Sequence, residues 1–191
     1  MFDVRCSPAL TRPMPTRISP QLRSRLKRVK LFLCDVDGVL TDGSVWMGGG
    51  MEIKRFGIRD GLGLKFLQQH GIKVGWVSRR PSQATQQRAE NLKIDFLMQR
   101  DSGKVAAVET LLRQTGLNWQ QVCYVGDDIV DLAVLKRAGV GVAVADAVAE
   151  ARAAADYVTK SPGGNGAVRE TVEWILKAQN KWNRVISEYA A

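Results

Sequence analysis

The sequence predicts an α/β protein built on a three-layer, Rossmann-like parallel sheet. Between residues 29 and 180, short apolar runs alternate with segments of helical period. This alternation is typical of parallel strands joined by crossover helices. The apolar runs are nearly continuous, as strands covered on both faces require. Several runs end in acidic residues or glycine, at the edge where open α/β sheets bind their ligands.

The first half of the domain begins with an apolar run that ends in acid. Next, two strand-like segments flank three glycines at 48–50, which predicts a small β-hairpin flap. Leucines at near-helical spacing followed by Gly71 predict a helix, and Pro81 is suited to begin another. The expected elements are a strand at 30–35, a hairpin at 44–56, a helix at 61–70, a strand at 72–77, a helix at 81–91 and a strand at 94–98.

The second half repeats the same alternation. Gly116 and Gly139 are placed to end two helices, and the apolar runs between helices are of strand length. The expected elements are a helix at 102–114, strands at 121–125 and 140–145 on either side of a helix at 129–138, a helix at 147–155, a strand at 157–159 and a helix at 166–180. The insert at 44–56 leaves no room for a large cap domain.

We expect one domain at 29–182, preceded by a basic tail at 1–28 and followed by a short tail at 183–191. The basic tail is expected to be disordered, with a helical stretch as an alternative near residues 21–30. The tail at 1–28 is rich in Arg, Pro and Ser and holds most of the formal net charge of +9. Because the charge is concentrated there and no nucleic-acid motif accompanies it, we expect no nucleic-acid partner. No apolar run approaches the roughly 20 residues of a membrane span, so we expect no membrane partner.

The three cysteines predict a reduced, cytoplasmic protein. Cys6, Cys34 and Cys123 are odd in number and show no metal-binding spacing, and two of them lie within expected strands. Buried thiols of this kind are typical of cytosolic proteins. His70, the single histidine, is expected at the end of a helix and is interpreted as a helix-terminal residue rather than a catalytic base.

Residues suited to phosphate-ester hydrolysis gather where the expected strands end. Asp35 and Asp37 follow the first strand, Ser78 follows the second, and Asp127 follows the run at 121–125. Lys104 lies near the start of the intervening helix. Each motif alone is common in turns or helix caps. Their joint occurrence at one edge of a sheet predicts a phosphatase site.

Each residue type fits a step of the reaction. Asp35 and Asp127 offer the oxygen ligands that Mg²⁺ prefers. A carboxylate, Asp35, attacks phosphorus to form an aspartyl-phosphate, and Asp37 protonates the leaving alkoxide and then activates water. Ser78 donates a hydrogen bond to the phosphoryl group, and Lys104 neutralises charge on phosphate and nucleophile.

These motifs resemble those of the haloacid-dehalogenase-like phosphatases. DVDGVLTDG, Ser78, Lys104 and GDDIVD are similar to the four motifs of that superfamily. GMEIKRFGIRDGLG at 50–63, VADA at 144–147, ADYVT at 155–159 and GGNGAVRE at 163–170 resemble the 3-deoxy-D-manno-octulosonate 8-phosphate phosphatase family. The resemblance covers residues 29–180.

The resemblance implies a capless, Mg²⁺-dependent phosphatase of lipopolysaccharide precursor synthesis that assembles as a homotetramer. It implies that the metal is held by Asp35, the carbonyl of Asp37, and Asp127, with Asp128 and Asp131 supporting metal waters or Lys104. Substrate is further expected to be bound by Arg59, Arg80 and Arg169. Arg80 is expected to contact the substrate carboxylate, and Arg169 the carboxylate or the phosphate. A neighbouring subunit is expected to complete each site, because the chain has no cap.

Two positions depart from the family pattern, and two alternatives stay open. Arg79 stands where the family usually has glycine, and Gly103 where it usually has aspartate. Both affect loop geometry and therefore substrate choice. A nonulosonate 9-phosphate is an alternative substrate, although in the family an arginine at position 80 goes with octulosonate. A non-catalytic domain that partners a nucleotide-sugar enzyme is the second alternative, against which the retained motif residues argue.

Overall fold

Six parallel strands form the centre of the protein in this computed structural model, which describes residues 18–101 and 103–190. The strands lie side by side in the order β5-β4-β1-β6-β7-β8. In chain order they are β1 Leu31–Cys34, β4 Lys73–Ser78, β5 Phe96–Gln99, β6 Val122–Gly126, β7 Val140–Ala143 and β8 Tyr157–Val158. Residues of β1 pair with both β4 and β6, so β1 is central and every one of its residues is buried.

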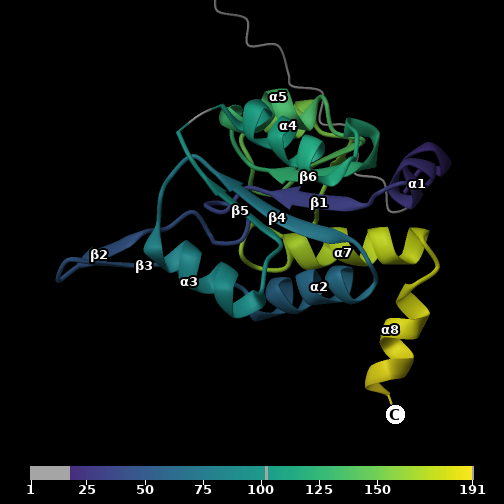
Figure 1. Cartoon of the computed structure of the whole chain (residues 1–191), viewed down its shortest axis with the longest axis horizontal. Coiled ribbons are helices and arrows are strands. Elements are labelled where there is room, and N and C mark those ends of the chain that lie inside the picture. The colour runs from purple at the N-terminus through teal and green to yellow at the C-terminus, as the bar shows by residue number, and fades with distance from the viewer. Residues whose placement is uncertain (1–17, 102, 191) are drawn as a thin grey trace, which may run out of the picture.

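Helices cover both faces of the sheet, which confirms the predicted three-layer α/β fold. Figure 1 shows α2, α3 and α7 on one face, and α4 and α5 on the other. The helices are α1 Pro20–Lys27, α2 Ile58–Gln69, α3 Gln83–Leu92, α4 Lys104–Thr115, α5 Leu132–Leu135, α6 Ala149–Ala154, α7 Ala167–Ala178 and α8 Trp182–Tyr189. No helix within 18–101 or 103–190 is long and apolar enough to cross a bilayer.

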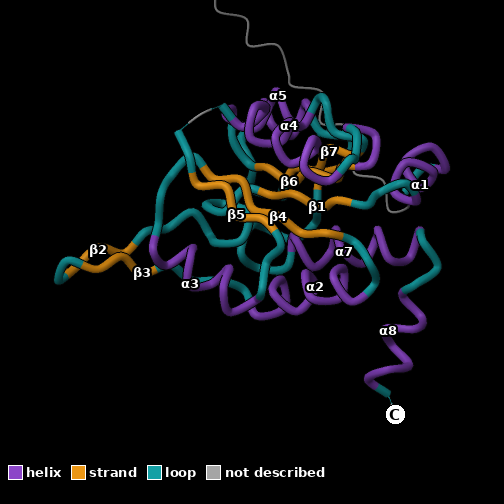
Figure 2. The backbone as a smooth tube through the Cα atoms, viewed as in Figure 1, coloured by secondary structure: helices purple, strands orange, loops and turns teal. Residues whose placement is uncertain are grey.

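The predicted hairpin flap is formed by β2 Trp46–Gly48 and β3 Met51–Ile53, which pair antiparallel. In the chain the hairpin lies between β1 and α2, and it projects from the body of the protein (Figure 2). Gly49 and Gly50 both have positive φ, which explains why glycines occupy the turn. In the described chain, this hairpin is the largest insert between β1 and α2, so no cap domain is present there.

The ends of the chain carry more structure than the sequence indicated. Helix α1 lies within the expected tail at 1–28, where Ser19 caps it and Leu22 and Leu26 are buried in the core. Residues 1–17 of that tail lie outside the described residues. Helix α8 occupies most of the expected tail at 183–191, and its Val185 is buried. Helix α1 overlaps the helical stretch considered near residues 21–30, whereas α8 was not expected, because it is short and buries one apolar side chain.

Two helices also differ from their predicted bounds. Helix α2 begins three residues before the expected 61, because the carbonyl of Gly57 already accepts a hydrogen bond from the amide of Gly61. Asp60 in this first turn is buried, and its carboxylate accepts hydrogen bonds from the amides of Gly166 and Arg169. The helix expected at 129–138 is instead a short 3₁₀ turn followed by the four-residue α5. Asp128 and Asp131 form a capping box in that turn, and Asp131 is drawn into the site described next.

Candidate active site

A buried lysine joins two aspartates at the carboxyl end of the sheet. Lys104, the first residue of α4, has a side chain only 2% exposed. Its Nζ donates hydrogen bonds to Asp35 Oδ2 at 2.5 Å and to Asp131 Oδ1 at 2.6 Å. Asp131 also accepts hydrogen bonds from the Tyr124 hydroxyl and from the backbone amide of Asp127. The cluster is therefore held in a fixed geometry and is largely buried.

The chain after β1 forms the tight turn that places Asp35. The amide of Asp35 donates to the carbonyl of Val125 and so extends the β1–β6 pairing by one residue. The carbonyl of Val36 then accepts from the amides of residues 39–41, which turns the chain back. Gly38 has φ of +80° and a Cβ there would overlap the Asp127 carboxylate. Glycine is thus required by both conformation and space.

Three carboxylates converge beside this turn with only one lysine to balance them. One oxygen from each of Asp35, Asp127 and Asp131 lies within 4.8 Å of the other two. Asp127 Oδ1 is buried and has no hydrogen-bond partner in the described protein. A buried, unpartnered carboxylate oxygen next to further carboxylates fits a divalent cation with oxygen ligands. The residues present therefore suit the predicted metal.

Burial and neighbouring charges raise the pKa values of Asp35, Asp127 and Lys104 above their ordinary values. Burial, together with the charges of Asp35 and Asp131, raises the pKa of Asp127 to about 8. Burial also raises the pKa of Asp35, although the nearby Lys104 ammonium opposes that effect. Burial lowers the pKa of Lys104, but Asp35 and Asp131 outweigh it, so that pKa lies above its ordinary value. Lys104 is therefore charged throughout the neutral range.

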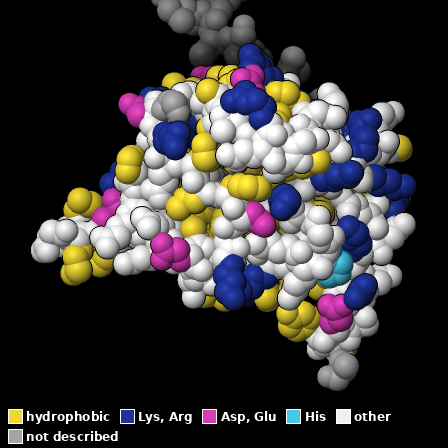
Figure 3. All heavy atoms as spheres, in the orientation of Figure 1, with side chains coloured by type: hydrophobic (Ala, Val, Ile, Leu, Met, Phe, Trp, Pro, Cys, Tyr) yellow, Lys and Arg dark blue, Asp and Glu magenta, His cyan; other side chains and the backbone are white. Residues whose placement is uncertain are grey.

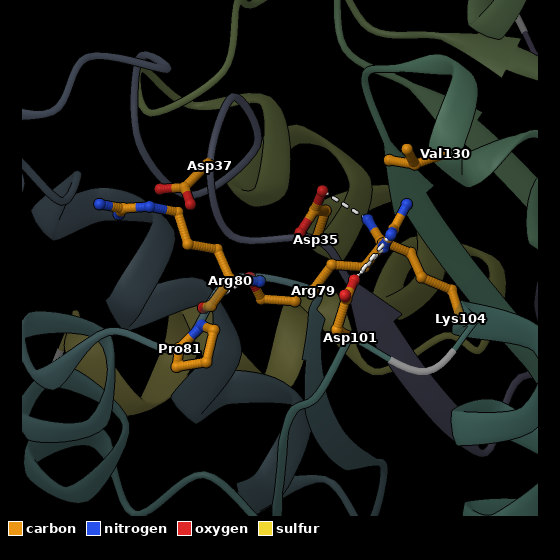
Figure 4. Close-up of a pocket in the computed structure, with 9 residues that line it drawn as sticks. Asp35, Asp37, Arg79, Arg80, Pro81, Asp101, Lys104 and Val130 are labelled. Atoms are coloured by element: carbon orange, nitrogen blue, oxygen red, sulfur yellow. Dashed lines mark hydrogen bonds and ion pairs between the residues drawn. The ribbon is translucent and has the colours of Figure 1, made fainter.

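An open hollow of about 490 Å³ lies in front of Asp35 and Lys104. Figure 4 shows Asp37, Arg80 and Pro81 on one side of it and Lys104 and Val130 on the other, with Asp35 between them. The residues that line it are Asp35, Asp37, Ser78, Arg79, Arg80, Pro81, Asp101, Lys104 and Val130. Four predicted catalytic residues and one predicted substrate-binding arginine thus face one space, whereas Asp127 lies beside it.

Ser78 and Arg80 are held at the hollow by short-range contacts. Ser78 ends β4, and its Oγ accepts a hydrogen bond from the amide of Arg80 at 3.1 Å. The guanidinium of Arg80 pairs with Glu52 of β3 at 2.5 Å, while its side chain stays 44% exposed. Arg79 pairs with Asp101 on the surface of the hollow. A Cβ at Gly103 would meet nothing within 4 Å, so the space there would admit a larger residue.

The sequence reasoning missed two residues next to Asp37. Lys54 follows β3, and its ammonium lies 2.7 Å from the Asp37 carboxylate. Glu52 lies 3.6 Å from Lys54 and pairs with Arg80 as described. Glu52 and Lys54 are two residues apart in an extended segment, so their side chains lie on the same face. This spacing was the sequence pattern that could have identified them. It was missed because charged residues on a hairpin are usually solvent-exposed.

Two predicted substrate-binding arginines lie away from the hollow. Arg59 is exposed in the first turn of α2 and does not line it. The guanidinium of Arg169 lies over the rings of Phe66 and Trp182, at 5.0 and 5.3 Å from their centroids, and its Nε donates to Glu173. Within one chain neither reaches Asp35, so their assignment as substrate ligands stays a prediction about a neighbouring subunit.

Comparison with known proteins agrees with the fold. Residues 93–170 match the haloacid dehalogenase-like hydrolase family. The 3-deoxy-D-manno-octulosonate 8-phosphate phosphatase of Salmonella typhimurium is 39% identical over 165 residues, which cover 86% of this chain and 88% of that protein. The protein of the same name from Yersinia pestis is 40% identical with the same coverage.

Solved structures give the same result. That of 3-deoxy-D-manno-octulosonate 8-phosphate phosphatase from Moraxella catarrhalis, in complex with magnesium ion, phosphate ion and KDO, matches with a TM-score of 0.85 at 39% identity and covers 87% of this chain and 97% of that chain. The cobalt-bound deoxy-D-mannose-octulosonate 8-phosphate phosphatase of Haemophilus influenzae matches with a TM-score of 0.80 at 40% identity and covers 82% of this chain and 92% of that chain.

The parallel sheet and the Asp35–Lys104–Asp131 cluster at its carboxyl edge define a haloacid dehalogenase-like hydrolase. Within that class, the identity to both curated relatives extends over most of the chain. The chain belongs to the 3-deoxy-D-manno-octulosonate 8-phosphate phosphatase family.

Proposed function

We propose that this protein hydrolyses 3-deoxy-D-manno-octulosonate 8-phosphate to 3-deoxy-D-manno-octulosonate and phosphate, in lipopolysaccharide precursor synthesis. One observation carries the proposal: Asp35 is buried at the end of β1, bonded to Lys104 and adjacent to the unpartnered carboxylate of Asp127. A divalent cation would offset the excess negative charge of the three carboxylates and so let the Asp35 nucleophile approach an anionic phosphoryl group. The relatives of the family act on this substrate by name.

The reaction proceeds in two steps on Asp35. A carboxylate oxygen of Asp35 attacks phosphorus, the bond from phosphorus to the sugar oxygen breaks, and Asp37 gives its proton to that oxygen. Water then attacks phosphorus, Asp37 takes the water proton, and the bond from phosphorus to Asp35 breaks. The charge of Lys104 offsets negative charge on Asp35 and the phosphoryl oxygens, and Ser78 donates a hydrogen bond to those oxygens.

Mg²⁺ is the proposed cofactor, held by carboxylate oxygens of Asp35 and Asp127 and by the backbone carbonyl of Asp37. When bound, it acts as a Lewis acid that neutralises phosphoryl charge. The proposal is supported by the unpartnered Asp127 Oδ1 and by the oxygen-only donor set. The Moraxella catarrhalis relative was solved with magnesium and phosphate ions.

Arg80 is the residue proposed to select the sugar acid. Its side chain lines the hollow and is 44% exposed, so a planar guanidinium is available to a substrate carboxylate. Its pairing with Glu52 fixes its direction without covering it. We further infer that Arg59 and Arg169 contact substrate bound in a neighbouring subunit. An octulosonate is therefore favoured over a nonulosonate 9-phosphate.

We infer a homotetramer of cytoplasmic protein. The hairpin carries several exposed apolar side chains (Figure 3): Trp46, Met47, Met51 and Ile53. Exposed apolar clusters of this kind commonly mark contacts between subunits. Cys34 and Cys123 are buried thiols, which suits a reducing compartment.

Phosphate release from a panel of phosphorylated sugar acids tests the function. We expect the octulosonate 8-phosphate to give the highest kcat/KM, and activity to disappear in EDTA and return with Mg²⁺. Asp35→Asn should lower kcat by roughly 10³-fold or more while the protein stays folded, because an amide forms no acyl-phosphate. Near-normal release by folded Asp35→Asn would disprove the nucleophile assignment. Preference for a nonulosonate 9-phosphate would disprove the substrate.

A further inference from the structure

Lys54 is a fully buried lysine whose ammonium contacts the proposed acid–base residue. Its side chain is 0% exposed. The Nζ atom lies 2.7 Å from Asp37 Oδ1 and donates a hydrogen bond of 3.0 Å to Asp37 Oδ2. Lysine is almost never fully buried unless it is paired, because its charge is costly to remove from water. Contact with both carboxylate oxygens restricts rotation of the Asp37 side chain.

The position of the Lys54 ammonium is set by groups other than Asp37. It donates a hydrogen bond of 3.2 Å to the Thr85 hydroxyl, in the first turn of α3. It also lies 3.6 Å from Glu52, two residues earlier in the hairpin. Glu52 is itself held, because it accepts from the Ser82 hydroxyl and pairs with Arg80. The donor that meets Asp37 is thus oriented in advance by α3 and β3.

We propose that Lys54 is a positioning residue for the reaction, which holds the Asp37 carboxylate in the one orientation that serves both proton transfers. The proposal rests on the proposed function, in which Asp37 protonates the leaving oxygen and later takes a proton from water. Asp37 is 26% exposed and lies on a turn, so without Lys54 its side chain rotates into solvent. Misplacement of a reacting group by about 1 Å lowers rates strongly. The hairpin thereby supplies a part of the active site.

A double-mutant cycle measures this coupling. The variants are Lys54→Met, Asp37→Asn and the combination of both, assayed with Mg²⁺ on 3-deoxy-D-manno-octulosonate 8-phosphate and on p-nitrophenyl phosphate. We expect Lys54→Met to lower kcat on the sugar phosphate by about 10- to 100-fold, with KM changed less than about threefold. This loss is no larger than the low end of the roughly 10²- to 10⁴-fold that general acid–base catalysis contributes, because Asp37 itself is retained. The double variant should be no slower than Asp37→Asn, because Lys54 acts through Asp37.

Two further comparisons separate positioning from a general structural effect. The loss should be smaller on p-nitrophenyl phosphate, because its leaving group needs no proton. Lys54→Arg should recover part of the kcat that Lys54→Met loses, because it keeps the charge and the donors. Lys136→Met, at an exposed lysine after α5, should keep the wild-type rate.

The proposal is overturned if the losses multiply in the double variant, or if Lys54→Met changes KM alone. If Lys54→Met does not fold, Thr85→Val is measured, since it removes one acceptor that orients Lys54. Thr85→Val should lower kcat by about 3- to 10-fold in the wild-type background. It should cause no further loss in the Asp37→Asn variant. A wild-type kcat for folded Thr85→Val would then overturn the proposal. A wild-type protein that hydrolyses only the aryl phosphate refutes the sugar substrate. On the aryl phosphate, the loss in Lys54→Met then reports only the second step, in which Asp37 takes the proton from water.

Discussion

Asp127 shows how a single carboxylate couples the metal site to protons. Burial and the charges of Asp35 and Asp131 raise its pKa from an ordinary 3.8 to about 8. Without a cation, Asp127 is therefore protonated in the folded protein between about pH 4 and pH 8, whereas it is ionised in the unfolded chain over the same range. The stability from this group is complete at low pH and is lost as pH rises toward 8. A divalent cation removes this penalty, because it replaces the proton.

We predict that Mg²⁺ stabilises the protein more at pH 8 than at about pH 6, because fewer protons must be displaced at the higher pH. The measurement is the rise in Tm on adding millimolar Mg²⁺ at the two pH values, with Ca²⁺-free buffers. In Asp127→Asn the dependence of that rise on pH should shrink, since the titrating ligand is gone. Equal Mg²⁺-induced shifts at both pH values in the wild-type protein would contradict the proposed ligand role.

At the scale of single elements, the sequence predicted the strands and helices that local residue patterns determine. The apolar runs of β1, β4 and β6 are short and continuous, and all three were found where expected. Helix α5 was predicted too long, because the tertiary contact of Asp131 with Lys104 overrides helical period. The Lys54–Asp37 contact joins residues 17 apart through a hairpin fold, and no local pattern carries it.

Helix α1 is the element whose role the sequence most understated. It packs against α7, and its Arg25 forms two hydrogen bonds with Asp156 in addition to one with the carbonyl of Gly139. Leu26 is 2% exposed and belongs to the hydrophobic core. A truncation at Arg28 would remove these contacts, so we expect the segment that begins at Pro20 to stabilise the domain.

We predict that Leu26→Ala lowers the free energy of unfolding by about 2–4 kcal/mol, from lost apolar contact and a residual cavity. Lys27→Ala, at the exposed neighbouring position, should change it by less than about 0.5 kcal/mol. Urea unfolding followed by circular dichroism gives both values. The folded Leu26→Ala protein should keep its kcat, because α1 does not line the hollow. A difference of less than about 0.5 kcal/mol between the two variants would show that α1 does not stabilise the domain.

At the scale of the whole molecule, the hairpin links assembly to the active site. Its inner face presents Glu52 to Arg80, and Lys54 beyond β3 reaches Asp37. Its outer face carries apolar side chains: Trp46, Met51 and Ile53 are 68%, 65% and 61% exposed. Trp46 and Ile53 are cross-strand partners, so they form one surface. A neighbour that covers this surface would hold the inner face against the hollow.

We predict that Trp46→Lys combined with Ile53→Lys converts the proposed tetramer to smaller species and lowers kcat/KM by about tenfold or more, because like charges oppose the contact and the flap loses its support. The mass in solution and the phosphate-release rate are measured on the same sample. A control adds the same charge at Gln87 and Gln114, two exposed glutamines on α3 and α4, and should keep both mass and rate. If the hairpin variant is monomeric yet fully active, assembly does not complete the site. If it stays tetrameric, the subunits meet through another surface. If activity falls as the oligomer dissociates, while circular dichroism shows a retained fold, the hairpin contact is needed both for assembly and for full catalysis.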